Sequence, residues 1–226
     1  MKITDSGTGD ISRPLFLSFE GEVKPGEPFA HMVPNTALAA SLMKELDGKV
    51  DLLAPVEVTG FSGDGAMGRV SLADGRTLLA PLVVASDGAM SAMRTYAGIK
   101  TFGHDYGQSG IVTTIAHTLP HEGTAYEHFR PHGPFASLPL PDRDGTHRSS
   151  LVWTETTADA VRVKASPSDA IAAEIADVMG YSLGEVKLEE PSVQTFPLRL
   201  QIAREFVAPR LALVSADEIT QQLAQL

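Results

Sequence analysis

The sequence predicts an α+β protein, on the strength of three observations. An apolar run over residues 78–85 is followed at once by Ser86-Asp87-Gly88 and a short segment with helical spacing. Apolar residues recur at helical spacing over 37–46 and again over 168–179. Short β-branched runs alternate with Pro and Gly over 111–154, a pattern typical of an antiparallel sheet.

Composition and charge narrow the class of protein. The 226 residues are 43% hydrophobic and 20% charged, as in an ordinary globular chain. The net charge of −10 argues against nucleic-acid binding. The chain has no Cys, which excludes disulfides, thiolate metal sites and cysteine nucleophiles. It has no apolar run near the ~20 residues of a membrane span and no signal-peptide apolar core, so we expect a cytoplasmic location.

The N-terminal region combines short strands with one helix. Residues 1–30 are expected to form a hairpin, with a turn-rich middle and a strand over 15–19. Asn35 is a suitable N-cap for the helix over 37–46, and Asp47-Gly48 ends it.

The elements that follow are mostly strands. A strand is expected over 50–58, interrupted by Pro55, and Ala73-Asp74-Gly75 joins the two strands of a hairpin. In the second half, Ser166-Pro167 opens the helix over 168–179 and Gly180 closes it.

The stretch around Asp87 has the pattern of a strand, a tight turn and a helix. The run over 78–85 suits a strand buried on both faces. Gly88 allows a turn or a close approach that a side chain would block. The helix over 91–96 has Asp87 or Ser86 as its N-cap. Its N-terminal N–H groups are expected to face a phosphate or a ribose.

Histidines and hydroxyl residues raise two other kinds of chemistry, metal binding and nucleophilic catalysis. Five side chains between 117 and 132 suggest a metal site: His117, His121, Glu122, His128 and His132. They lack a tight ligand pair such as His-Glu-x-x-His, and a polar strand surface is the favoured interpretation. No metal site is therefore predicted. No Ser-His-Asp spacing stands out, so nucleophilic catalysis is not predicted and no catalytic side chain is named.

The Asp-Gly stretch also resembles a known motif. Ala-Ser-Asp-Gly-x-x-Ser-x-x-Arg, followed by Gly98-Ile99, resembles the DG motif of class A flavoprotein aromatic hydroxylases. In that family the motif touches FAD and lies near the path of NAD(P)H. The resemblance implies a cofactor site made by four residues: Asp87, Gly88, Ser91 and Arg94. The alternatives are a simple helix cap and turn, and, for Arg94, a solvated helix charge.

A second resemblance runs through four ordered blocks. They are Tyr106-Gly-Gln-Ser-Gly-Ile-Val-Thr-Thr, Pro120-His-Glu-Gly-Thr-Ala-Tyr-Glu-His-Phe, Gly133-Pro-Phe-Ala-Ser-Leu-Pro-Leu and Ser150-Leu-Val-Trp-Thr. They closely resemble the substrate-domain sheet of ubiquinone-biosynthesis hydroxylases of the 2-octaprenyl-6-methoxyphenol hydroxylase type. Segments at 196–198 and 208–214 fit the same family, so the resemblance covers about residues 1–215.

The resemblance implies a partial dinucleotide-binding (FAD) domain and an antiparallel-sheet substrate domain of the para-hydroxybenzoate hydroxylase type. Four segments are expected: a hairpin of mixed membership (1–30), the FAD-domain part (31–99), the substrate domain (100–200) and a return strand (201–226). The implied reaction is hydroxylation of a prenylated phenol, with FAD as cofactor and NAD(P)H as reductant. The candidate ring-binding residues are Tyr126, Phe129, Phe135, Leu138 and Pro139, with ordinary core as the alternative.

The departures from the family are also informative. The family's strand, Gly-x-Gly-x-x-Gly and helix unit and its Gly-Asp-Ala-Ala-His segment are not found, and Ala39 stands where the family usually has an Arg. The chain therefore resembles an internal fragment, expected to be inactive alone and without tightly bound FAD. The alternatives are a non-catalytic scaffold and a binding module for a prenylated quinone precursor.

Association with other molecules is expected as well. Apolar surface near 78–85 would favour a homo-oligomer or partners from ubiquinone biosynthesis. A prenylated substrate would suit a peripheral position at the membrane.

Overall fold

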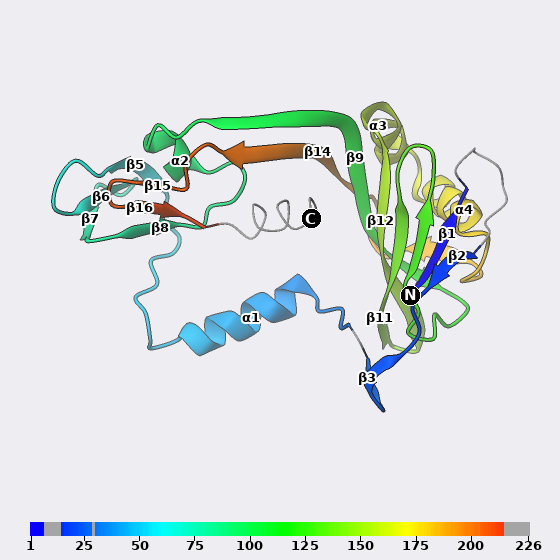
Figure 1. Cartoon of the computed structure of the whole chain (residues 1–226). Coiled ribbons are helices and arrows are strands. Elements are labelled where there is room, and N and C mark those ends of the chain that lie inside the picture. The colour runs from blue at the N-terminus through cyan, green and yellow to red at the C-terminus, as the bar shows by residue number, and fades with distance from the viewer. Residues whose placement is uncertain (7–14, 29, 215–226) are drawn as a thin grey trace. The chain divides into compact units, whose positions relative to one another are not determined.

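A computed structural model of the chain describes residues 1–6, 15–28 and 30–214 (Figure 1). The chain divides into two compact units, each made of two separate segments. Unit 1 comprises Met1–Leu42 and Gly107–Leu198, and unit 2 comprises Met43–Tyr106 and Arg199–Leu226. The division after Tyr106 and Leu198 lies near the boundaries expected at 100 and 200, whereas residues 1–42 group with unit 1.

Unit 1 is built on a sheet with the strand order β13-β9-β12-β11-β10-β1-β2, and β14 also pairs with β9. The strands are β1 Lys2–Asp5, β2 Leu15–Ser18, β9 Thr101–His117, β10 Tyr126–Phe129, β11 Phe135–Arg143, β12 Thr146–Thr156, β13 Val186–Leu188 and β14 Gln194–Ala203. The pairs β10–β11, β11–β12 and β12–β9 are antiparallel, which confirms the sheet predicted over 111–154. The expected turn over 6–10 lies largely outside the described residues.

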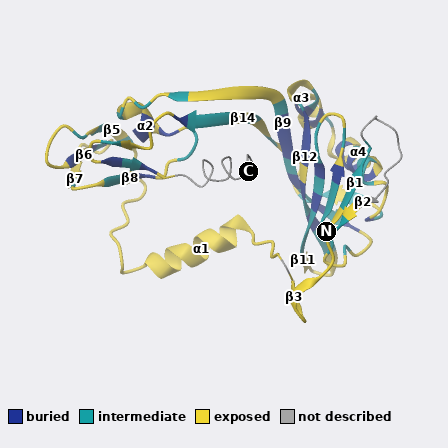
Figure 2. Cartoon of the chain, viewed as in Figure 1, coloured by how far each residue is buried: buried dark blue, intermediate teal, exposed yellow. Residues whose placement is uncertain are grey.

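Two helices, α3 (Thr157–Ala165) and α4 (Ser168–Met179), pack on one face of this sheet. α3 begins at Thr156, whose hydroxyl accepts a hydrogen bond from Asp159 N, and α4 ends at Gly180 in the left-handed conformation. Ile171 and Ile175 of α4 pack with sheet side chains in a common core. Figure 2 shows the buried residues along these elements. The members of this core are Ile111, Ile115, Phe135, Leu151, Trp153, Ala160, Val163, Ile171, Ile175, Leu183 and Val193.

The N-terminal segment adds a small hairpin and a helix. β3 (Glu22–Lys24) and β4 (Glu27–Pro28) form an antiparallel pair. α1 (Asn35–Leu46) confirms the predicted helix, and no residue in it is buried. Its apolar side chains Leu38, Leu42, Met43 and Leu46 are all exposed.

Unit 2 contains two small sheets and one short helix. β5 (Val58–Ser62), β6 (Gly68–Leu72) and β7 (Thr77–Ala80) form an antiparallel sheet, which confirms the predicted hairpin around Gly75. β15 (Val207–Ala208), β16 (Leu211–Leu213) and β8 (Val83–Ala85) form the second sheet, in which β16 and β8 are parallel. α2 (Ala92–Tyr96) follows β8. Their shared core is Val70, Leu72, Ala85, Met93, Ala203, Leu211 and Leu213.

Two strand predictions in this unit are wrong. The run over 78–85 is not one strand buried on both faces: Pro81, which has no N–H to donate, stands between β7 and β8. Leu79, Leu82 and Val84 are each more than half exposed. The strand expected over 50–58 is also absent, because regular pairing starts only at Val58, beyond Pro55.

Candidate cofactor and substrate sites

The Asp-Gly turn lies at the carboxyl end of β8 in unit 2. Gly88 has φ +77°, a left-handed conformation that residues with a Cβ seldom adopt. Gln201 of β14 donates from Nε2 to the carbonyl of Ala89 at 3.2 Å. The turn is therefore held from a strand 112 residues further along the chain, a contact that the sequence pattern does not reveal.

Asp87 is the central acceptor of this turn. Its carboxylate accepts from the Ser91 hydroxyl at 2.6 Å and from Met93 N at 3.0 Å. Partial burial by itself raises the pKa of Asp87, but these hydrogen bonds outweigh it and hold that pKa below its ordinary value. Asp87 is therefore a carboxylate at neutral pH. The N-cap of α2 is Ser91, so the prediction of Asp87 or Ser86 at that position is wrong, although Asp87 also accepts from the first turn. Two N–H groups of that turn are thus already used within the protein, since Arg94 N donates to Ser91 Oγ at 2.9 Å.

Arg94 is the least expected member of the group. Its side chain is not a solvated helix charge, because the residue is only 7% exposed. Among the residues that the structure describes, no ion pair or hydrogen bond joins its guanidinium to another side chain or carbonyl. Its guanidinium nitrogens nevertheless keep some contact with solvent, since none of them is a fully buried atom without a partner. Its position therefore fits an anionic group such as the phosphates of a dinucleotide.

A second glycine-rich stretch lies in the same unit. Gly63, Gly65 and Gly68 have the spacing Gly-x-Gly-x-x-Gly, but they join the antiparallel strands β5 and β6, and no helix follows them. A Cβ on Gly63 would lie 1.9 Å from the carbonyl oxygen of Pro209. These glycines allow close packing in a hairpin, and the dinucleotide motif requires a strand and a helix around it.

The five predicted ring-binding residues lie on β10 and β11 of unit 1, but they do not share one face. Side chains alternate along a strand, so Phe135 and Pro139 point to the helix-covered face and Leu138 to the opposite, open face. Phe135 is 3% exposed and packs against Trp153, with ring centroids 5.7 Å apart. It belongs to the core, so all five cannot form one pocket.

The same alternation places Tyr126 on the helix side and Phe129 on the open side. Tyr126 pairs with Ser137, which has the orientation of Phe135. Phe129 is exposed. Of the predicted set, Phe129 and Leu138 are therefore left on the open face.

Hydroxyl groups extend this open face beyond the predicted residues. Leu138 pairs with Ser150, and Ser150 pairs with Thr114, so the three lie in one row across β11, β12 and β9. The next row is Ala136, Val152 and Val112. The sequence could indicate alternation within each strand, but the register that places these rows side by side came only from the structure.

Two of the histidines are more buried than the sequence predicts. His117 and His128 lie in the interior, which contradicts the favoured polar-surface interpretation. Nε2 of His117 is 3.0 Å from Ser149 Oγ, and its Nδ1 is 2.8 Å from the carbonyl oxygen of Leu119. Within the described ranges, no group of three or more His, Asp or Glu side chains is placed to hold a metal ion.

The fold and the Asp-Gly turn define a class, namely proteins with the α+β FAD-binding fold of flavin-dependent monooxygenases. PqsL of Pseudomonas aeruginosa, solved in complex with 2-aminobenzoylacetate, superposes with a TM-score of 0.72 over 98% of this chain and 62% of its own. The two sequences are 18% identical, so this likeness concerns the fold alone.

The chain belongs to the family described as FAD binding domain, whose model matches residues 16–214. It is 39% identical over 215 residues to the ubiquinone hydroxylase UbiL of Rhodospirillum rubrum, covering 94% of this chain and 48% of UbiL. It is 31% identical over 186 residues to the 3-demethoxyubiquinol 3-hydroxylase of Escherichia coli, covering 81% of this chain and 46% of that enzyme. The chain thus spans about half the length of these relatives and resembles the FAD hydroxylases of ubiquinone biosynthesis.

Proposed function

We propose that this chain supplies the Asp-Gly cofactor turn and the ring-facing sheet of a FAD-dependent monooxygenase that hydroxylates a prenylated phenol in ubiquinone biosynthesis. The observation that carries the proposal is the turn at the end of β8, where the guanidinium of Arg94 has no ion pair or hydrogen bond to the described residues. The names of the relatives support the substrate class.

In this proposal the two units have different tasks. Unit 2 binds the cofactor through Asp87, Gly88, Ser91 and Arg94, and unit 1 presents the open sheet face to the aromatic ring. FAD, reduced by NAD(P)H, supplies the chemistry of oxygen activation. Arg94 is placed to neutralise phosphate charge, and Asp87 fixes the turn through its hydrogen bonds to Ser91 and Met93. The half-buried face that carries Leu138 provides a poorly hydrated surface for the ring.

We also propose that the 226-residue polypeptide by itself binds FAD weakly and hydroxylates nothing. Gly63–Gly68 does not have the geometry of a pyrophosphate site, and two N–H groups of α2 are occupied by Asp87 and Ser91. Each missing charge-assisted hydrogen bond costs ~1.5–3 kcal/mol, and ~1.4 kcal/mol is a tenfold change in affinity. A titration followed by flavin fluorescence is expected to give a Kd weaker than micromolar, and tighter binding would contradict this point.

A chimera tests the activity itself. Residues 16–214 would replace the matching part of R. rubrum UbiL, and hydroxylation of a prenylated phenol would be followed with FAD and NAD(P)H. We expect turnover in the parent chimera, and a loss of at least tenfold in Arg94→Met and Asp87→Ala. A chimera that is folded and loaded with FAD but leaves prenylated phenols unchanged would overturn the proposal.

One observation favours a second candidate function. The internal capping of α2 leaves fewer free N–H groups for a cofactor than a dinucleotide site usually offers. A flavin-free binding module for a prenylated quinone precursor would need only the sheet of unit 1. Quinone binding by the purified chain, together with a folded chimera that shows neither flavin absorbance nor hydroxylation, would favour this candidate.

A further inference from the structure

One edge of the unit 1 sheet is open. β13 is the terminal strand of that sheet, and among the residues that the structure describes no strand pairs with its outer edge. On its inner side β13 pairs antiparallel with β9. Thr118 N donates to the carbonyl of Glu185 at 3.2 Å, and Glu189 N donates to the carbonyl of Thr114 at 3.0 Å. Both ends of β13 are therefore fixed to β9, and the outer edge is left without a neighbouring strand.

The backbone groups on this open edge belong to Val186 and Leu188. In an antiparallel pair, successive residues direct their N–H and C=O groups alternately toward the partner strand and away from it. Glu185 and Glu189 direct theirs toward β9, so Lys187 does so as well, and Val186 and Leu188 direct theirs outward. Within the described ranges, no turn, loop or side-chain hydrogen bond uses these outward groups. The edge therefore presents donors and acceptors in the spacing that an extended chain matches.

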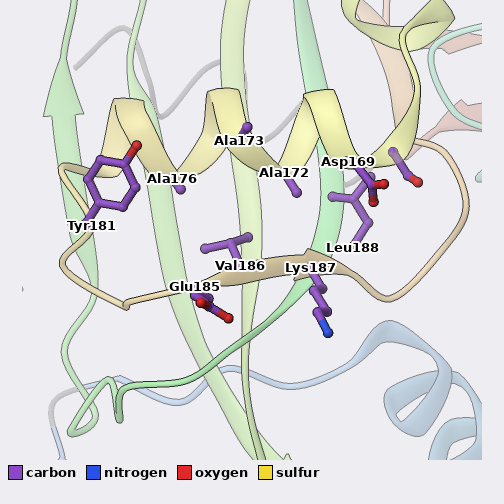
Figure 3. Close-up of a pocket in the computed structure, with 10 residues that line it drawn as sticks. Asp169, Ala172, Ala173, Ala176, Tyr181, Glu185, Val186, Lys187 and Leu188 are labelled. Carbon is purple, nitrogen blue, oxygen red and sulfur yellow. The ribbon is translucent and has the colours of Figure 1, made fainter.

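A recess lies between this edge and α4. It has a volume of about 470 Å³, and Ala172 and Ala176 of α4 face Val186 across it (Figure 3). Val186 and Leu188 direct their side chains to the same side, because both pack against the helix-covered core. A cavity of about 150 Å³ holds benzene, so the recess accommodates two or three apolar side chains of that size.

The two ends of the recess differ in chemistry. Asp169, in the first turn of α4, lies at the end near Leu188, and Tyr181 lies at the other end (Figure 3). Among the described residues, no ion pair or hydrogen bond engages the exposed side chain of Asp169. Lys187 of β13 points away from α4 (Figure 3), so it is no counter-charge for Asp169. A ligand of this recess is therefore expected to place a cation at Asp169 and an apolar group at Tyr181.

We propose that the recess binds an extended segment of another protein, which adds to the open edge of β13 as an antiparallel strand. Main-chain hydrogen bonds to Val186 and Leu188 hold the segment, and its alternate side chains enter the recess. The antiparallel direction is the more stable and the more common one. This surface is separate from the cofactor turn, so the inference goes beyond the proposed function.

The direction of the added strand determines the pattern of its side chains. In an antiparallel strand, the residue opposite Leu188 precedes the residue opposite Val186. The end near Asp169 therefore receives the start of the segment, and the end near Tyr181 receives its last part. The predicted pattern is a basic residue, then two aliphatic residues and one aromatic residue, each separated from the next by one polar residue.

The test uses the purified 226-residue protein and the heptapeptide acetyl-Arg-Ser-Val-Ser-Val-Ser-Phe-amide. Binding and hydrogen exchange are followed by NMR of the backbone amides. We expect a Kd in the micromolar range. The peptide is expected to slow exchange of the Val186 and Leu188 amides by about tenfold or more, because their N–H groups become hydrogen-bonded.

Two methylated peptides separate strand addition from other kinds of binding. Methyl groups on the two Val nitrogens remove the N–H groups that face β13, whereas methyl groups on the second and third Ser nitrogens remove N–H groups that face away. We expect the first peptide to bind at least about tenfold more weakly than the unmethylated one, and the second to stay within about threefold. The protein is unaltered in this comparison, so its folding is not at issue.

A change of charge locates the basic residue. A peptide with Gln in place of Arg is expected to bind the parent protein about tenfold more weakly. Asp169→Asn is expected to bind the two peptides alike. Asp51→Asn, the same change at an exposed position of unit 2, is expected to keep the preference of the parent protein for Arg.

Several outcomes would overturn the inference. Absence of binding, or equal affinity for the two methylated peptides, would contradict strand addition. An unchanged preference for Arg in Asp169→Asn would contradict the position of the segment. Slow exchange of Val186 and Leu188 without peptide, in a dimer that the peptide dissociates, would make a second copy of this chain the occupant instead. No arm uses flavin or a phenol, so failure here leaves the proposed function intact.

Discussion

At the scale of single residues, the chain keeps a few polar groups in the interior, and each has a different status. Asp87 is satisfied by two hydrogen bonds, and His117 is satisfied at both ring nitrogens. Thr113 Oγ1 is buried without a partner among the described residues, whereas the guanidinium of Arg94 has no partner there but keeps some contact with solvent. Because an unpaired buried hydroxyl destabilises a fold, Thr113 is a cost to the core of unit 1, and Arg94 is a cation that remains available to an anion.

Arg94 yields a direct prediction about anions. We expect sodium pyrophosphate to raise the Tm of the parent protein and to leave that of Arg94→Met unchanged. At a concentration a hundred times Kd the gain is about 2.7 kcal/mol, or roughly 5–10 °C for a chain of this size. Without pyrophosphate, Arg94→Met is expected to melt no lower than the parent, since the substitution breaks no ion pair or hydrogen bond of the guanidinium to the described residues. Arg94→Lys serves as the control that keeps the charge, and equal pyrophosphate shifts in parent and Arg94→Met would rule out the anion site.

His117 yields a prediction about pH. Burial lowers the pKa of His117 below the ordinary 6.5, and the nearby His121 and His147 act in the same direction. The unfolded chain therefore takes up a proton that the folded chain resists, so the free energy of unfolding decreases as pH falls through about 6.5 and is unaffected above it. Urea unfolding between pH 8 and pH 5 measures this, and His117→Gln is expected to flatten the dependence. An equally steep dependence in His117→Gln would assign the effect to other groups.

At the scale of elements, local sequence signals were reliable where caps and turns set the limits. The end of the helix at Gly180 and the hairpin around Gly75 were predicted from glycine at these positions, since glycine favours the left-handed conformation that such caps and turns require. Both glycines adopt that conformation in the structure. The run over 78–85 was wrongly predicted as one buried strand. Pro81 divides it into β7 and β8, and no periodic signal distinguishes one buried strand from two short ones. The same limit applies to the candidate sites: the Asp-Gly turn is a local pattern, whereas the row of Leu138, Ser150 and Thr114 depends on strand register.

The β5–β6 turn offers a matched pair of glycines. A Cβ on Gly63 would overlap the carbonyl of Pro209, whereas a Cβ on Gly65 meets no atom within 4 Å. Gly63→Ala is expected to lower the free energy of unfolding by about 1–3 kcal/mol through overpacking. Gly65→Ala is expected to change it by less than about 1 kcal/mol. Urea denaturation measures both, and similar losses in the two variants would contradict the packing role of Gly63.

The helix α1 carries a prediction about association. Its Leu38, Leu42, Met43 and Leu46 are exposed, and exposed apolar clusters of this kind favour contact with other chains. We predict a dimer or higher oligomer, and Leu42→Glu is expected to shift it toward the monomer without lowering Tm, since no residue of α1 is buried. Ser41→Glu on the same helix is the control for added charge. Sedimentation velocity measures the distribution, and a parent protein that is monomeric at high concentration would refute the prediction.

At the scale of the whole molecule, neither unit is a continuous stretch of chain. Unit 1 takes its residues from both sides of the segment 43–106, and unit 2 is completed by residues after 198. Composition and local patterns carry no information on such an arrangement. The family resemblance indicated the return of residues 201–226, but it left residues 1–30 unassigned to one part and placed 31–42 with the FAD-domain part, whereas both groups lie in unit 1. The match with UbiL extends over parts of both units, because its 215 residues cover 94% of this chain.

The pairing of β1 with β10 has a consequence for the ribosome. The hydroxyl of Thr4 lies 2.7 Å from Nδ1 of His128, a contact between residues 124 positions apart. At a synthesis rate of ~5–20 residues per second, β1 waits roughly 6–25 s for β10 to be made. A two-stranded ribbon such as β1 with β2 is marginal in water meanwhile. β1 therefore pairs with β10 only after the residues between them have been made, and until then the N–H and C=O groups on that edge of β1 are open to other partners.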